Sequence, residues 1–458
     1  MSQVIKKNEE YIVDIIDNGY EGEGIAKVNN FIVFIPGTIK GEKVKILIVK
    51  VTTSHAFGKV LKIIKESNSR NNNIDCSTYK RCGGCNLRHI KYEDTLKIKK
   101  EIVQNLVNKT LKTKIDVKDT IGMEKPYNYR NKAQFPVGTD KDGNPIIGVF
   151  ASRTHEVIKF DNCFIQNKTS QEIAKIICEF AKEKNICVYD EKNRKGLLRH
   201  IVIKVGLKTN EIMCILVIND KEFKEEKELV NVLTEKFPNI KTIVKNINMK
   251  NTNVILGKEN INLYGDGYIY DKLGDYTFKI SPLSFYQINP VQTEKLYNLA
   301  LEGAELTGNE IVFDLYCGIG TIGMYMAKYA KEVYGIEIVK EAIEDAKENC
   351  KINNVANAQY FAGDTQELLT DLILNKNIKP DVIVVDPPRK GLDNTTVENI
   401  LKIEPKKVVY ISCNPATLTR DLGKLEQKYE IKSIQPVDMF PFTSHVECIA
   451  LLSLKWIA

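Results

Sequence analysis

The sequence predicts a multidomain α/β protein with an N-terminal β-barrel, a central α+β domain and a C-terminal Rossmann-like domain built on a doubly wound sheet. At 458 residues the chain is too long for a single hydrophobic core. Short β-rich runs separated by Gly and Pro turns fill the first 65 residues, whereas strands and helix-length segments alternate regularly from about residue 283 onward. We therefore expect domains at residues 1–65, 66–275 and 276–458.

The first two domains are read from local patterns. The barrel is expected to be OB-like, with strands in segments 11–16, 24–28, 31–35 and 43–49. A polar linker, 66–75, follows it, and segment 92–111 has the charged amphipathic pattern of a helix that can pack on the C-terminal domain. The central domain is expected to contain strands at 198–205 and 212–218 and a helix at 170–183.

The C-terminal domain is expected to have a seven-stranded sheet. A last strand, 446–454, follows six strands that end at Tyr316, Glu337, Gly363, Asp386, Ser412 and Asp438. If the last strand runs antiparallel, its beginning lies at the edge where the parallel strands end.

Composition limits the class of protein without naming it. Hydrophobic residues make up 43% and charged residues 27% of the chain, and no apolar run approaches the length that spans a membrane. The N-terminus lacks the pattern of a signal peptide, so a cytoplasmic location is expected, with no membrane association and no indicated protein partner. A net charge of +7 is a weak indication of a polyanionic partner.

A glycine-rich turn joins the first C-terminal strand to a helix. Segment 311–323, IVFDLYCGIGTIG, carries Asp314 at the strand end and Gly318 and Gly320 in the turn, where the backbone can approach a ligand closely. Glu337 ends the next strand about 14 residues after Gly323, a shorter interval than the roughly 20 residues of a dinucleotide fold. That spacing, together with Asp314 and segment 384–389, VVDPPR, favours S-adenosylmethionine over a dinucleotide.

Cys413 is the candidate nucleophile. It follows the fifth strand directly in segment 408–415, VVYISCNP, and ligands of open α/β sheets bind beyond the carboxyl ends of the strands. Glu447, at the start of the last strand, is the candidate base. Five other cysteines are expected to be buried structural residues, namely Cys178, Cys187, Cys214, Cys350 and Cys448.

Four further cysteines form a candidate metal site. Segment 76–85 supplies Cys76, Cys82 and Cys85 at close spacing, and Cys163 is the expected fourth ligand. The spacing alone fits either a zinc ion or a [4Fe-4S] cluster. Disulfides are not expected, because the eleven cysteines lie in a chain without an export signal.

Segment 127–135, YNYRNKAQF, interleaves aromatic side chains with cations and amides, a composition suited to stacking bases and holding phosphates. Tyr129, Arg130 and Lys132 are the candidate RNA contacts there. Phe285 is a candidate stacking partner for a base turned out of its helix.

Together, the segments DLYCGIG, DPPRKG, SCNP and HVE resemble the RNA (uracil-5-)-methyltransferase family over almost the whole chain. The resemblance implies that Gln287, in segment 281–289 (SPLSFYQIN), binds S-adenosylmethionine together with Tyr316, Glu337 and Asp386. It also implies that Cys413 is the nucleophile and Glu447 the proton acceptor. The barrel resembles a TRAM domain, which the ribosomal branch of the family carries together with a [4Fe-4S] cluster.

The resemblance implies methylation of C5 of a uridine in 23S rRNA. C5 is a poor nucleophile until a thiolate adds to C6, after which a base must remove the C5 proton. A tRNA (uracil-5-)-methyltransferase is the first alternative, and the barrel and cysteine cluster count against it. A methyltransferase acting on an exocyclic nitrogen and a non-catalytic RNA-binding or assembly protein are further alternatives.

Overall fold

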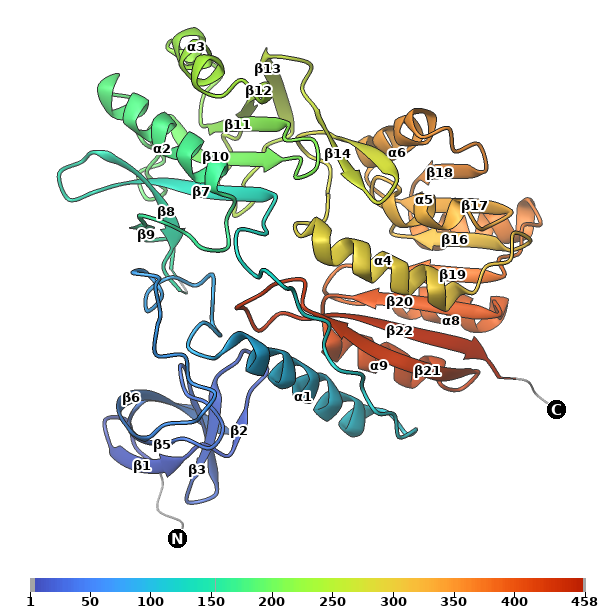
Figure 1. The fold of residues 1–458 in the computed structure, drawn as a ribbon, viewed down its shortest axis with the longest axis horizontal. Helices are drawn as coiled ribbons and strands as arrows, with labels where there is room; N and C mark the ends of the chain where they lie inside the picture. The colour runs from blue at the N-terminus through green and yellow to red at the C-terminus, as the bar shows by residue number, and fades with distance from the viewer. Residues whose placement is uncertain (1–4, 153, 456–458) are drawn as a thin grey trace.

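The computed structural model describes residues 5–152 and 154–455. Figure 1 shows three parts, with the N-terminal barrel (blue) and the central domain (green) on one side and the C-terminal domain (yellow to red) on the other. Within the described residues, no helix is both long and apolar enough to cross a membrane.

The N-terminal part is a six-stranded sheet that closes on itself. The sheet order is β1-β5-β6-β4-β3-β2, and the hydrogen bond from Ile16 N to Ile25 O, 2.8 Å, links the end of β1 to β3. Alternate residues of each strand point inward and form a separate apolar core. The strands are β1 (Glu10–Asp14), β2 (Asp17–Asn18), β3 (Gly24–Val28), β4 (Phe31–Ile35), β5 (Lys43–Val51) and β6 (His55–Lys65).

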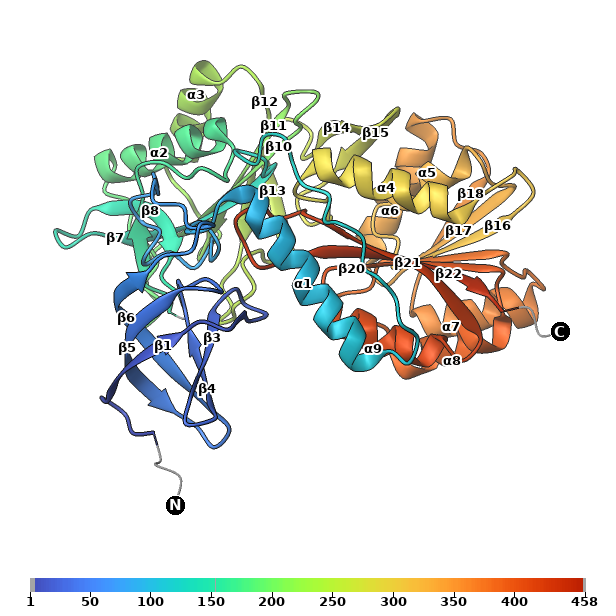
Figure 2. The same cartoon turned by 60° about the horizontal axis from the view of Figure 1, so that its bottom comes forward.

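A long helix, α1 (Tyr92–Thr110), connects the barrel to the central domain but packs on the C-terminal domain. Its buried residues Val103 and Val107 lie in the same core cluster as Leu418 and Leu422 of α9 (Pro415–Leu425). Both views show α1 beside α9 (Figures 1 and 2). The helix thus ties the segment that follows the barrel to the far end of the chain.

The central domain is a seven-stranded sheet in the order β13-β12-β11-β10-β7-β8-β9. Helices α2 (Lys168–Glu183) and α3 (Glu226–Lys236) cover one face and share an apolar core with it. The strands are β7 (Lys132–Thr139), β8 (Pro145–Phe150), β9 (Val157–Lys159), β10 (Leu198–Val205), β11 (Ile212–Ile218), β12 (Ile240–Ile247) and β13 (Glu259–Tyr264).

The predicted boundary at residues 275 and 276 falls inside a hairpin. Strands β14 (Ile269–Leu273) and β15 (Tyr276–Ile280) pair with each other, and their residues Ile269 and Phe278 share one core cluster with Val202 and Met213 of the central sheet and with the C-terminal domain. The central and C-terminal domains therefore share a continuous core, which a boundary drawn from sequence pattern cannot reveal.

The C-terminal domain has the expected seven-stranded sheet, in the order β18-β17-β16-β19-β20-β22-β21. Strands β16 to β20 are parallel neighbours, and β22 runs antiparallel between β20 and β21. The strands are β16 (Ile311–Leu315), β17 (Glu332–Glu337), β18 (Ala358–Ala362), β19 (Val382–Val385), β20 (Lys407–Ser412), β21 (Tyr429–Val437) and β22 (Glu447–Leu454).

Helices cover both faces of this sheet, as Figure 2 shows. On one face lie α4 (Pro290–Ala304), α5 (Thr321–Ala327) and α6 (Lys340–Ile352), and on the other α7 (Thr365–Thr370), α8 (Asn394–Ile403) and α9, with the π-helix η1 (Asp371–Asn375) following α7. Alternate strand residues feed the two cores: Val312 and Val384 enter one, and Phe313 and Ile383 the other. The loops at the carboxyl ends of the strands are thereby left free to form a site.

Candidate active site

The antiparallel register of β22 brings Glu447 opposite Cys413. In the β20–β22 ladder Ser412 pairs with Cys448, so Cys413, directly after β20, and Glu447, the first residue of β22, each lie one position beyond that pair, and Glu447 is close enough to raise the pKa of Cys413. Directly opposed residues project to the same face of a sheet with Cβ atoms about 5 Å apart. A thiol and a carboxyl group that lie 34 positions apart in the chain therefore share one side of the sheet edge.

Burial and mutual repulsion control the protonation of this pair. Burial, together with repulsion from the Glu447 and Asp386 carboxylates and against the opposing effect of Arg389, raises the pKa of the Cys413 thiol to about 11. Burial, followed by repulsion from Asp386, also raises the pKa of Glu447 well above its usual range. In the ligand-free protein the thiol is thus protonated at neutral pH, and Arg389 is the cation that favours its thiolate.

Asp386 connects this pair to the neighbouring strand end. It follows β19 directly, and Gln287 Nε2 donates to its Oδ2 at 3.4 Å. Burial raises the pKa of Asp386 to about 7. The sequence singled out Asp386 and Gln287 separately, and the fold brings their side chains into contact across a separation of 99 positions.

The glycine-rich turn lies at the ends of β16 and β17. Gly318 N donates to Glu337 Oε2 at 3.2 Å, and Gly323 N donates to Asp314 Oδ2 at 2.8 Å. Gly320 has a φ of 81°, and a Cβ atom there would lie 2.7 Å from the Tyr360 ring. Only glycine therefore fits this position without displacing its neighbours.

The same turn has the features of a site for a polar nucleoside ligand. A Cβ atom on Gly318 would meet no atom within 4 Å, so its backbone faces open space. Among the described residues, Oδ1 of the buried Asp314 has no hydrogen-bond partner, and burial raises the pKa of this group to about 8. Tyr316, with a φ of 67°, directs its hydroxyl to Asp393 Oδ2 at 3.4 Å. These residues fit S-adenosylmethionine, whose ribose and amino acid groups need such partners.

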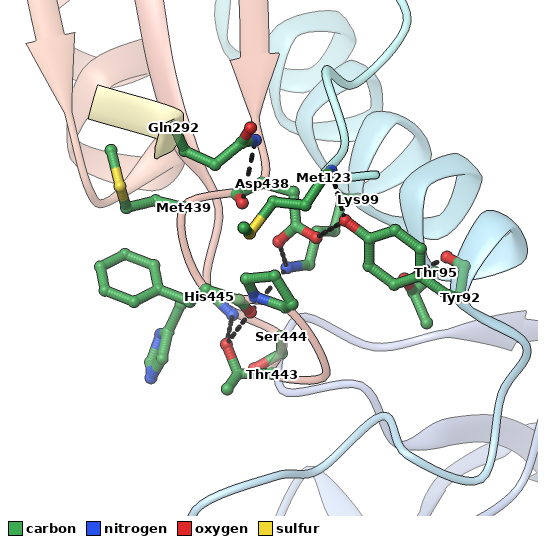
Figure 3. Close-up of polar contacts among 12 residues, drawn as sticks. Tyr92, Thr95, Lys99, Met123, Gln292, Asp438, Met439, Thr443, Ser444 and His445 are labelled. Carbon is green, nitrogen blue, oxygen red and sulfur yellow. Dashed lines mark hydrogen bonds and ion pairs between the residues drawn. The ribbon is translucent and has the colours of Figure 1, made fainter. Parts of the chain in front are cut away.

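A buried ion pair holds the loop that leads to Glu447. Figure 3 shows Lys99 and Tyr92 of α1 pointing toward Asp438, at the end of β21. Lys99 Nζ bonds Asp438 Oδ1 at 2.5 Å and Phe440 O at 3.2 Å, and Tyr92 donates to Asp438 Oδ2 at 2.8 Å. Both charged side chains are fully buried. Sequence reasoning missed this pair, since Lys99 lies on a helix predicted only as amphipathic.

The four predicted metal ligands line one cavity. Cys76, Cys82, Cys85 and Cys163 surround a space of about 100 Å³, and Gly84 N donates to Cys82 Sγ at 3.2 Å. Burial raises the pKa of Cys85 to about 12, with further contributions from Cys163 and Cys82. Yet within residues 5–152 and 154–455, no group of three or more His, Cys, Asp or Glu side chains is close enough to hold a metal ion. Among the described residues the cysteines thus share a cavity, but their spacing supports neither a zinc ion nor a cluster.

The predicted RNA contacts divide into buried and exposed residues. Tyr129, a predicted RNA contact, is only 3% exposed and donates its hydroxyl to Pro441 O, so its ring packs inside the protein. Lys132 is half-buried in β7 beside Lys204, and burial lowers its pKa. Arg130, also half-buried, lines the cysteine cavity. Phe285 is 60% exposed, which leaves its predicted role open.

One of the five cysteines that were expected to be buried is not buried. Cys187 is exposed, whereas Cys178, Cys214, Cys350 and Cys448 are buried as predicted. Cys187 precedes the turn at residues 190–195 and lies outside the regular strands, so no sheet covers it.

Comparison with known proteins shows the family of the chain. A family model described as tRNA (Uracil-5-)-methyltransferase matches residues 91–455, and a TRAM domain model matches residues 6–61. An uncharacterized RNA methyltransferase of Clostridium tetani is 46% identical over 450 residues, which cover 98% of this chain and 97% of the relative. One from Clostridium acetobutylicum is 48% identical over 452 residues, which cover 98% of each chain.

A solved structure extends the similarity to the arrangement of domains. The tRNA (uracil-54, C5)-methyltransferase of Pyrococcus abyssi, in complex with S-adenosyl-L-homocysteine, has a TM-score of 0.77 and 27% identity. The match covers 96% of this chain and 100% of that one. The resemblance predicted from the sequence is confirmed, and the chain belongs to the tRNA (uracil-5-)-methyltransferase family.

Proposed function

We propose that the protein methylates C5 of a uridine in RNA, using S-adenosylmethionine as methyl donor, with Cys413 as nucleophile and Glu447 as base. The observation that carries the proposal is the β20–β22 register, which brings the thiol that follows β20 and the carboxyl group at the start of β22 close enough for Glu447 to raise the pKa of Cys413. When bound, S-adenosylmethionine supplies the methyl group. Gln287, Asp314, Tyr316, Gly318, Gly320, Glu337 and Asp386 are the residues that would hold it.

The chain's own residues perform the remaining steps. The Cys413 sulfur adds to C6 of the uracil, and the electron pair of the C5–C6 double bond becomes available at C5 for the methyl group. Glu447, once ionised, accepts the C5 proton, and the C6–S bond then breaks to restore the double bond and release Cys413. The positive charge of Arg389 favours the thiolate at the start of the cycle and at its end.

A substrate analogue tests this mechanism. RNA in which the target uridine is 5-fluorouridine offers no C5 proton, so the enzyme should remain joined to it through Cys413 after methyl transfer. We expect a covalent complex on a denaturing gel that requires S-adenosylmethionine and is lost in Cys413→Ala. If RNA binds but no complex forms, the mechanism is wrong and the non-catalytic RNA-binding alternative gains support.

We propose 23S rRNA as the substrate, with tRNA as the second candidate. The support for rRNA is the resemblance of the barrel and the cysteine segment to the ribosomal branch of the family. The barrel does not distinguish an rRNA enzyme from a tRNA enzyme as expected, however. The P. abyssi tRNA enzyme matches 96% of this chain, and the unmatched 4% is too small to contain the barrel. Mapping 5-methyluridine in both RNAs from cells that lack the protein would decide between them.

We also infer that the four cysteines hold a [4Fe-4S] cluster with a structural role. Support comes from the resemblance of the cysteine segment to the ribosomal branch, from the cavity that all four cysteines line and from the backbone N–H that Gly84 directs at Cys82 Sγ. Protein purified without oxygen should contain about four iron and four sulfide ions per chain, and Cys82→Ser should lose both. Loss should weaken RNA binding before S-adenosylmethionine binding, and zinc in place of iron would contradict the proposal.

A further inference from the structure

The N-terminal barrel reaches the residue next to the nucleophile. Tyr20, in the hairpin between β2 and β3, donates its hydroxyl to Asn414 Oδ1 at 3.1 Å, across a separation of 394 positions. Asn414 follows Cys413 directly and begins α9. A residue of the barrel thus contacts the turn that carries the catalytic thiol.

Asn414 is the residue that fixes this turn. Its Oδ1 also accepts from Ala416 N at 3.1 Å, which caps α9, and its Nδ2 donates to Arg389 O at 2.9 Å. The side chain therefore joins the Cys413 turn to the segment that carries Asp386 and Arg389. Tyr20 adds a contact from outside the C-terminal domain to this junction.

A second contact holds the hairpin against the opposite wall of the site. Asn86, next to Cys85, donates from Nδ2 to Glu21 O at 2.5 Å and to Ser444 Oγ at 2.8 Å, and its Oδ1 accepts from Ser444 N at 2.7 Å. One amide thus joins the hairpin to the loop that leads to Glu447. A Cβ atom on Gly22 would lie 2.3 Å from Leu87 Cδ2, so the hairpin has no room to move closer.

Tyr20 is partly exposed and lies near the residues of the proposed site. Its side chain is 44% exposed although the hydroxyl is engaged. Burial is the main cause that raises the pKa of its hydroxyl, and Cys413 and Arg389 both lie close enough to affect it. The ring consequently faces solvent beside the groups that must meet the uracil.

We propose that Tyr20 is a positioning residue for the methyl transfer. Through its hydrogen bond to Asn414 it orients the Cys413 thiol, and Asn86 holds the hairpin that carries Tyr20 in place. The inference rests on the proposed function, since it assigns the barrel a part in that reaction in addition to any role in binding RNA. Docking of the barrel then speeds the attack on C6, because without it the turn loses one of its fixed contacts.

Tyr20→Phe is the direct test, with Tyr11→Phe as the matched control. Tyr11 lies in the same barrel, and its hydroxyl bonds Glu9 instead of the C-terminal domain. Trapping of 5-fluorouridine RNA is followed at saturating RNA and S-adenosylmethionine. Tyr20→Phe should slow the trapping rate roughly 2- to 10-fold, the equivalent of one hydrogen bond, and leave the Kd values of RNA and S-adenosylmethionine unchanged. Tyr11→Phe should trap at the wild-type rate.

A second variant separates positioning from general loosening of the barrel. Asn86→Ala should also slow trapping, and Tyr20→Phe combined with Asn86→Ala should be no slower than Asn86→Ala alone, because both act through the same docked hairpin. A wild-type trapping rate in Tyr20→Phe, or a loss that appears only as weaker RNA binding, would overturn the inference. Failure of the wild-type protein to trap at all would instead count against the proposed function.

Discussion

Lys99 and Asp438 form an ion pair with both side chains fully buried, although they lie 339 positions apart in the chain. The pair joins α1 to the end of β21, and Glu447 follows after a short loop. A segment next to the cysteine cavity and a segment of the catalytic sheet are therefore held together by charge as well as by apolar packing.

Lys99→Met is expected to destabilise the protein by about 3–5 kcal/mol, because it leaves the Asp438 carboxylate buried without its cation. Unfolding in urea, followed by circular dichroism, measures the change. Lys97→Met is the control, since the Lys97–Asp94 pair lies at the surface, with Lys97 74% exposed, and its loss should change the stability far less. Similar losses of stability in the two variants would show that burial does not make the Lys99–Asp438 pair more important for stability than a surface pair.

Glu447→Gln is expected to accumulate a covalent complex with ordinary uridine RNA. The amide cannot accept the C5 proton, so addition and methyl transfer proceed while release of Cys413 stops. Denaturing gels of enzyme, RNA and S-adenosylmethionine should show a complex that the wild-type protein does not retain. Cys413→Ser should form none, and rapid turnover by Glu447→Gln would mean that another group removes the proton.

The rate of methyl transfer to ordinary uridine RNA should rise with pH between about 6.5 and 8.5. The pKa of Cys413 is raised to about 11, so below that value the thiolate fraction grows by up to about tenfold per pH unit. Ionisation of Asp386 and Glu447 opposes part of this rise, because both carboxylates raise the pKa of Cys413, so the slope should stay below tenfold per pH unit. Single-turnover rates across this range provide the measurement.

Arg389→Gln should lower that rate at each pH, because removal of the cation raises the pKa of Cys413 further. Arg389→Lys keeps the positive charge and is expected to recover much of the rate. A rate that falls as pH rises would show that a protonated group limits the reaction.

Gly320→Ala should weaken binding of S-adenosylmethionine. The backbone has a φ of 81° and the added Cβ atom would lie 2.7 Å from Tyr360, so the turn must move to accept it. Gly143→Ala is the matched control: its φ is 82°, but its Cβ atom would meet nothing within 4 Å. Strain of about 1–2 kcal/mol should lower the stability of both variants, whereas calorimetry should show loss of ligand affinity in Gly320→Ala alone.

The sequence by itself determined the elements and the chemistry they carry. Strands β10 and β11 have the predicted bounds, and the strands of the C-terminal sheet end within one residue of the predicted positions. Hydrophobic periodicity is a local property, so it can be recognised in the sequence without knowledge of the fold. The glycine-rich turn and the cysteine after a buried strand were readable for the same reason, because each motif lies in one short segment.

Only the tertiary structure decided which segments meet. Glu447 became a partner of Cys413 through the antiparallel pairing of β22, and Tyr20 reached Asn414 through the docking of the barrel. Tyr129 looked like a residue that contacts RNA, yet it is buried against the loop at Pro441. Contacts between distant segments depend on the packing of whole domains, and no pattern within nine or ten residues carries that information.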